Sequence, residues 1–105
     1  MAGFISTVRF LVKEGYVDEF IRMHYSPDGI NQKGIGIEQY MTQTGDRTFT
    51  WIGLFESEDQ IAGLRSHLVG ELDKLRDLLE EISSELGLTD PSFAPVIWTN
   101  LRSYI

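Results

Sequence analysis

The spacing of hydrophobic and polar positions changes several times along the chain, and each change predicts a new element. Residues 4–13 (FISTVRFLVK) are rich in β-branched and aromatic side chains that loosely alternate with polar ones, which predicts a strand. After Gly15, apolar side chains recur at spacings of three and four, which indicates a helix. That helix should end by Ser26, because Pro27 disfavours helical geometry in the residue before it. Residues 27–36, rich in Gly, then predict an irregular loop.

Two apolar runs follow, residues 35–44 and 47–56, and the sequence between them predicts a hairpin. Gly45 and Asp46 separate the runs, and such a pair favours a two-residue turn because Gly tolerates positive φ. In that register Tyr40 lies opposite Trp51 on one face of the hairpin. Both faces carry apolar side chains, so we expect something to cover each of them.

Ser57 begins the string SEDQ, which matches a capping box at the start of a second helix. Leu and Ile then recur at steps of three and four as far as Leu86, so the pattern predicts one long amphipathic helix that Gly87 ends. Roughly 30 residues of helix would measure about 45 Å. We therefore expect a bend or break near Gly70, and we assign the acidic side chains of residues 71–81 to the solvated face.

A last strand is predicted at residues 96–101 (VIWTNL), after a loop at residues 89–95 (TDPSFAP). The resulting order, β-α-β-β-α-β, is the α+β ferredoxin-like arrangement, an antiparallel sheet with both helices on one face. A chain of 105 residues corresponds to a single domain, residues 1–105. The uncovered sheet face keeps large apolar side chains and so indicates a partner surface. A second copy of the chain is the simplest partner, which predicts a homodimer.

The composition excludes several classes of partner and site. Nine Lys and Arg against sixteen Asp and Glu give a net charge of -7, which opposes binding to nucleic acid or to an anionic membrane surface. The lack of Cys excludes disulfides, thiolate catalysis and thiolate metal sites. We find no apolar run of about 18 residues and no signal peptide pattern, so we expect a cytoplasmic protein.

His24 and His67 are the only imidazoles, and their ordinary pKa near neutrality makes them the candidate catalytic groups. Each also has a structural interpretation. His67 lies at the edge of the apolar stripe, and His24 lies near a helix end where a cation suits the dipole. The two His are far apart in sequence and have no carboxylates at ligand spacing, so we predict no metal site.

Four further residues are candidates for binding a substrate: Arg9, Tyr40, Trp51 and Asn100. Arg9 interrupts an apolar strand, where a charge needs a partner or solvent. An ion pair with Glu38 and an anionic group of a substrate are the two alternatives. Tyr40 and Trp51 are more simply explained as a cross-strand aromatic pair that packs in the core or in a dimer.

The strings LVKEGYVDEFI and WIGLFESEDQIAGLRSHL resemble the antibiotic biosynthesis monooxygenase-like family of dimeric α/β-barrel proteins. The first resembles the family's opening strand, turn and acidic-aromatic helix, and the second its strand, capped helix and His. The resemblance implies a homodimer whose two sheets form a shared barrel, with a ligand pocket between sheet and helices in each subunit. Members include cofactor-independent monooxygenases that oxidise aromatic compounds, heme-degrading enzymes and proteins without established activity.

The leading hypothesis from this resemblance is a small-molecule protein, with oxidation of an aromatic or polyketide-like substrate without a bound cofactor as its activity. Alternatives are a ligand-binding or stress-related homodimer without turnover, and a purely structural or accessory dimer. Heme degradation has the least support. In comparison with that branch, Val8, Leu64 and Lys74 stand where a pocket Asn, a Trp and the heme-ligating His would be expected.

Overall fold

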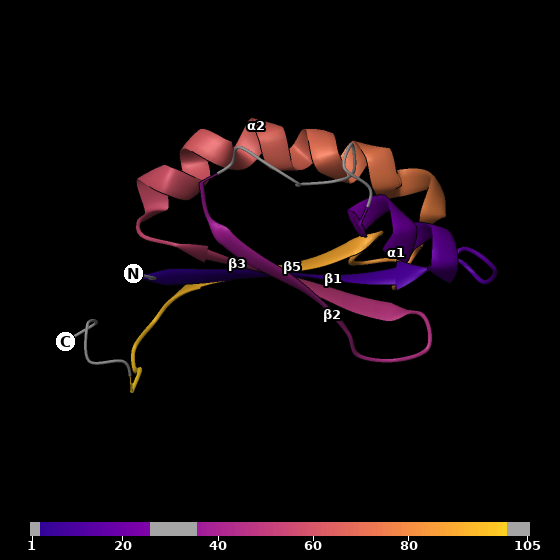
Figure 1. Cartoon of the computed structure of the whole chain (residues 1–105), viewed down its shortest axis with the longest axis horizontal. Helices are drawn as coiled ribbons and strands as arrows, with labels where there is room; N and C mark the ends of the chain where they lie inside the picture. Colours follow the sequence, from indigo (N-terminus) through magenta and orange to yellow (C-terminus); the bar gives the residue numbers. More distant parts are fainter. Residues whose placement is uncertain (1–2, 26–35, 101–105) are drawn as a thin grey trace.

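Five strands form one antiparallel sheet in the computed structural model, which describes residues 3–25 and 36–100 (Figure 1). Together with two helices on one side of the sheet, they confirm the predicted α+β ferredoxin-like fold. In chain order the elements are β1 (Phe4–Val12), α1 (Val17–Tyr25), β2 (Glu38–Gln43), β3 (Thr48–Phe55), α2 (Glu58–Leu75), the short 3-10 helix η1 (Arg76–Leu78), β4 (Leu79–Glu80) and β5 (Thr89–Pro95). Neither helix of this described part is long and apolar enough to cross a membrane.

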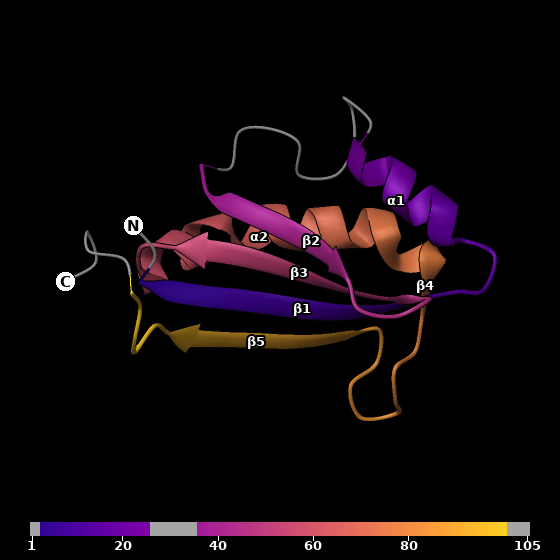
Figure 2. The same cartoon turned by 60° about the horizontal axis from the view of Figure 1, so that its bottom comes forward.

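Strand β1 is the centre of the sheet. It pairs with β3 on one side and with β5 on the other, and β2 extends the sheet beyond β3 (Figure 2). The short β4 pairs with the last two residues of β1, next to the first residue of β5. The strand order is therefore the one expected of a ferredoxin-like domain, with β5 as the final strand.

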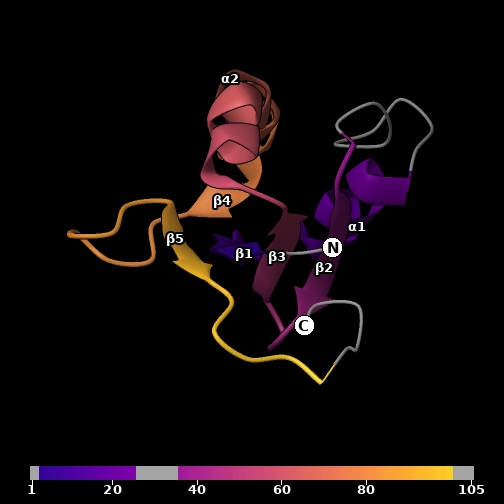
Figure 3. The ribbon, with the colours of Figure 1, turned by 90° about the vertical axis from the view of Figure 1, so that its left-hand side faces the viewer.

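The two faces of the sheet differ sharply. In β3, Phe49, Trp51 and Phe55 are buried, whereas the alternating Ile52 and Leu54 are only partly buried. Both helices cover the first face, with α1 above β2 and α2 on the side of β4 and β5 (Figure 3). The buried core consists of Phe10, Val12, Phe20, Phe49, Trp51, Phe55, Leu75, Leu78 and Leu79. We call the opposite side, which no described helix covers, the bare face.

Helix α1 is anchored to the sheet by Phe20. Its ring is fully buried and lies 4.6 Å from the ring of Phe49 and 6.1 Å from that of Phe10, measured between centroids. The predicted helix after Gly15 is confirmed, and Gly15 has the positive φ of 88° that suits its role before the helix. The predicted helix end at Ser26 lies outside the described residues.

The hairpin between β2 and β3 is confirmed, but its predicted register is wrong by one residue. The backbone N–H groups of Thr44 and Gly45 both donate to the carbonyl of Thr48, so the turn contains three residues, 45–47, and not two. Tyr40 is therefore opposite Ile52, and Trp51 is opposite Met41. Because strand side chains alternate, the extra turn residue places Tyr40 on the bare face and Trp51 under the helices.

The capping box at α2 is confirmed in its main feature. The Ser57 hydroxyl accepts from the Gln60 N–H at 3.2 Å, and the Gln60 side chain accepts from the Glu56 N–H at 2.7 Å. The polar groups at this helix start are thus satisfied by neighbours in sequence.

The rest of the prediction for α2 is wrong, because the helix passes through Gly70 without a break and ends at Leu75. Leu78 and Leu79 are buried, and Leu79 pairs with Val12 at the end of β1. Leu78 and Leu79 therefore pack at the end of the sheet and do not extend α2.

The last strand is also displaced from its predicted place. Residues 89–95, predicted as a loop, form β5, whereas the described residues 96–100 contain no strand. Pro91 and Pro95 made this strand hard to predict, because Pro cannot donate a hydrogen bond to a neighbouring strand and is confined to edge strands. Within the described residues β5 pairs only with β1. Its other edge makes no ladder hydrogen bonds there, so a Pro, which has no backbone N–H, is tolerated.

Candidate functional site

A cavity of about 400 Å³ lies between α2 and the helix-covered face of the sheet. The strands contribute Ser6, Val8, Phe10, Trp51, Thr89 and Pro91, and α2 contributes Ile61, Arg65, Leu68, Val69, Glu71, Leu72 and Leu75. The lining is mainly apolar with a few polar groups, as in pockets that bind small organic ligands.

Two small residues meet where β1 and β3 pass under α2. Ser6 is directly opposite Gly53. A Cβ atom at position 53 would lie 2.5 Å and 2.9 Å from two carbons of the Trp51 indole, so the indole occupies the space that a side chain there would need. The indole N–H of Trp51 donates to Gln39 Oε1 at 2.9 Å, which fixes the ring as one wall of the cavity.

Two charged side chains of α2 line this cavity, and sequence reasoning selected neither. The Glu71 side chain is only 12% exposed and lies 3.2 Å from Lys74 Nζ and 3.6 Å from His67 Nε2. Arg65 is exposed. Arg65 and Glu71 lie directly beside the apolar stripe of α2, one on each side of it. This position in the sequence pattern could have distinguished them from the residues of the solvated face.

His67 does not line the cavity. Its side chain is 40% exposed on α2, and it approaches the cavity only through Glu71. The predicted catalytic role of His67 therefore stays a prediction, with Glu71 as the group through which it would act.

His24 lines a second cavity of about 320 Å³, between α1 and the ends of β2 and β3. Its Nδ1 is 2.8 Å from the carbonyl oxygen of Phe20. A carbonyl oxygen only accepts hydrogen bonds, so Nδ1 carries the proton in this contact. The ring also packs on Phe20, with 4.8 Å between centroids, which gives His24 a structural role whatever else it does.

Arg9 lies on the bare face and pairs with Asp90, so the predicted ion pair with Glu38 is wrong. Its Nη2 and Nε are 2.9 Å and 3.2 Å from one carboxylate oxygen of Asp90. The sheet explains the choice, because Asp90 is directly opposite Arg9 on the adjacent strand β5, whereas Glu38 is two strands away on β2.

Of the six residues predicted for the site, only Trp51 lines the cavity under α2. Arg9 and Tyr40 are on the bare face, and the exposed Asn100 follows β5 without lining either cavity. Among residues 3–25 and 36–100, no three His, Asp or Glu side chains are grouped as metal ligands. The absence of a metal and of a bound cofactor stays a prediction.

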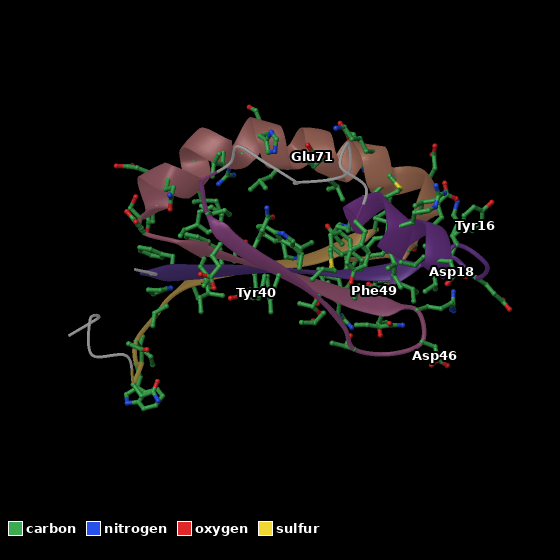
Figure 4. All side chains as sticks on the ribbon, in the orientation of Figure 1. Tyr16, Asp18, Tyr40, Asp46, Phe49 and Glu71 are labelled. Carbon is green, nitrogen blue, oxygen red and sulfur yellow. The ribbon has the colours of Figure 1, made fainter. Side chains whose placement is uncertain are left out.

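On the bare face, the Tyr40 hydroxyl donates to the carboxylate of Glu38, two residues away on β2. This hydrogen bond, and then the negative charge of Glu38, raise the pKa of Tyr40 above its ordinary value of 10.0. Figure 4 labels Tyr40 on its strand and Glu71 on α2. Tyr40 therefore belongs to the surface that the helices leave uncovered.

The sequence matches no protein-family model and no curated protein sequence. Solved structures nevertheless share its fold. A NIPSNAP family protein of unknown function from Agrobacterium tumefaciens has 19% identity and a TM-score of 0.63, over 90% of this chain and 88% of that one. SnoaB, a cofactor-independent oxygenase from Streptomyces nogalater, has 12% identity and a TM-score of 0.61, over 95% and 98%. The chain has the fold of the antibiotic biosynthesis monooxygenase-like proteins.

A protein from Bacillus cereus assigned to the antibiotic biosynthesis monooxygenases extends this comparison. It has 19% identity and a TM-score of 0.56, over 96% of this chain and 99% of that chain. Identities this low establish the fold alone, and function has to be argued from the cavities and surfaces of this chain.

Replacing Glu38 with Gln should lower the pKa of Tyr40 toward 10.0, because the variant loses the charge of the acceptor. A raised pKa means that the folded state favours the neutral phenol. The hydrogen bond from Tyr40 to Glu38 therefore stabilises the folded state below pH 10.0. This stabilisation is lost as the pH rises through the pKa of Tyr40 in the folded state. Ultraviolet titration of tyrosinate, with Tyr40→Phe as the reference for the other tyrosines, measures the shift. An identical titration curve for Glu38→Gln would contradict the assignment.

Proposed function

We propose that this chain binds a small, largely apolar ligand in the cavity between α2 and the sheet. The observation that carries the proposal is the cavity itself, since about 400 Å³ is large enough for an organic molecule with two or three rings. Leu68, Leu72 and Val8 supply apolar contact, and the fixed indole of Trp51 supplies a flat wall for stacking.

Filling the cavity should abolish binding. We expect the wild-type chain to bind the neutral fluorescent probe N-phenyl-1-naphthylamine saturably, and Leu68→Trp to weaken binding by about tenfold or more, because the larger ring occupies the site. Leu86→Trp is the matched control, since Leu86 is 42% exposed and does not line the cavity. Fluorescence titration measures both affinities, and circular dichroism verifies that the variants fold. Unchanged binding by Leu68→Trp would refute this location.

The second part of the proposal is that two copies of the chain associate through the bare face. Ile5, Leu11, Ile52 and Leu54 lie on that face by the strand register, and Tyr40 adds an aromatic ring that is 51% exposed. Apolar area of this kind on a sheet is typical of a partner surface. The dimeric barrel that the family resemblance implies would cover it with the same face of a second subunit.

A charge in the middle of the bare face should separate the subunits. Ile52→Glu is expected to convert a dimer into a monomer at micromolar concentration, because it would place a carboxylate in an apolar interface. Leu86→Glu introduces the same charge at an exposed leucine outside this face and should leave the dimer intact. Sedimentation velocity distinguishes the two states. A wild-type chain that sediments as a monomer would end this part of the proposal.

A second candidate function is oxidation of an electron-rich aromatic compound by O₂ without a bound cofactor. Glu71 favours it, because a carboxylate that is 12% exposed beside an apolar cavity is placed to accept a substrate proton, with His67 next to it. For an anthrone, loss of that proton gives an enolate that reduces O₂. The methylene becomes a carbonyl, one oxygen atom enters the product and the other leaves as water. The fold shared with SnoaB is consistent with this chemistry.

Oxygen uptake tests this candidate. We expect the wild-type chain to consume O₂ in equal molar amounts with an anthrone, and Glu71→Gln to slow the reaction by about a hundredfold, the usual loss for a general base. His67→Ala should slow it less, because His67 acts through Glu71. If His24→Ala alone abolishes uptake, the reaction belongs to the second cavity. If no anthrone or quinol consumes O₂, the ligand-binding function stands without turnover.

A further inference from the structure

Arg65 differs from every other arginine in the described residues because it has no acidic partner. Arg9, Arg22, Arg47 and Arg76 each lie within 4 Å of a carboxylate oxygen. The chain has sixteen Asp and Glu against nine Lys and Arg, so carboxylates are abundant. Helix α2 nevertheless provides Arg65 with none, since the positions one turn away are Ile61, Ala62, Leu68 and Val69.

The unpaired guanidinium stands at the cavity that we propose as the ligand site. Arg65 lines that cavity among apolar side chains of α2, and the same residue is exposed to solvent. Glu71, the other charged residue of the lining, already has Lys74 at 3.2 Å and His67 at 3.6 Å. The uncompensated charge of this site is therefore positive, although the chain as a whole carries a net charge of -7.

We propose that Arg65 binds an anionic group of the ligand, so that the cavity selects amphiphilic organic anions: an apolar ring system with a carboxylate, sulfonate or ionised phenol at one end. A guanidinium offers a planar fork of donors that matches such oxygens and stays charged at every physiological pH. Its position at the rim allows the anion to keep part of its hydration while the apolar body enters the cavity. The inference rests on the proposed function of this cavity.

Helix geometry also gives the bound ligand a direction. Positions 65 and 71 are six residues apart, which corresponds to roughly 120° around the helix, on opposite flanks of the apolar stripe. Glu71 would repel an anionic group, whereas Arg65 would attract it. The anionic end of the ligand therefore lies at Arg65, and its apolar end lies along Leu68 and Leu72 toward the Trp51 indole.

Two fluorescent probes with the same aryl frame test the inference. The anionic 8-anilino-1-naphthalenesulfonate carries a sulfonate that N-phenyl-1-naphthylamine lacks. Arg65→Gln should weaken binding of the sulfonate probe by about tenfold, the loss expected for one charge-assisted contact, and leave the neutral probe unchanged. Arg65→Lys should retain part of the affinity because it keeps the charge. Arg22→Gln, which removes the same charge from a side chain of α1 that is 76% exposed, should change neither probe.

The result that overturns the inference is an unchanged affinity of Arg65→Gln for the sulfonate probe, or an equal loss for both probes. The variant Leu68→Trp separates this failure from failure of the proposed function. If Leu68→Trp blocks the neutral probe while Arg65→Gln affects neither, the apolar cavity stands and the anion assignment falls. If Leu68→Trp blocks neither probe, the ligand does not occupy this cavity, and both proposals fail.

Discussion

The pairing of β1 with a strand on each side is the constraint on which the rest of the structure depends. Once its register with β3 and β5 is fixed, alternation assigns every side chain of β1 to one of two environments. Ser6 and Phe10 face the helices, whereas Arg9 faces the other way and meets Asp90. The proposed ligand cavity and the proposed subunit contact thus lie on opposite sides of one strand, and a shift of its register by one residue would change both.

The helix-covered face holds both the aromatic core and the two cavities. At α1 the ring of Phe20 packs against the rings of Phe10 and Phe49, next to the smaller cavity that His24 lines. Under α2, β1 presents the small side chain of Ser6 to the larger cavity, and the Trp51 indole lies over Gly53. The helix is held at its end, where Leu75 is buried, and the space before that end stays open. Phe10, Trp51 and Leu75 therefore belong both to the buried core and to the wall of this cavity.

Local signals in the sequence predicted the elements that local chemistry determines. The capped start of α2 at Ser57, the helix after Gly15 and the β2–β3 hairpin are all found, and their order was enough to predict the ferredoxin-like fold. The errors come from tertiary contacts. The regular spacing of Leu and Ile as far as Leu86 predicts a continuous helix. Nothing in that spacing shows that Leu79 pairs with the end of β1. Pro91 and Pro95 indicate a loop unless the strand is known to lie at an edge.

Candidate site residues were harder to predict, because the site depends on which face of the sheet each side chain occupies and on how deeply it is buried. One additional residue in the hairpin turn moved Tyr40 away from Trp51, to the other side of the sheet. Arg65 and Glu71 differ from ordinary surface charges in the sequence only by lying beside the apolar stripe of α2, and the cavity beneath α2 shows why that position matters. Gly53 has a related consequence. It does not touch the cavity, yet a methyl group there would push the Trp51 ring out of its place. A residue outside the lining can therefore set the shape of the proposed ligand site.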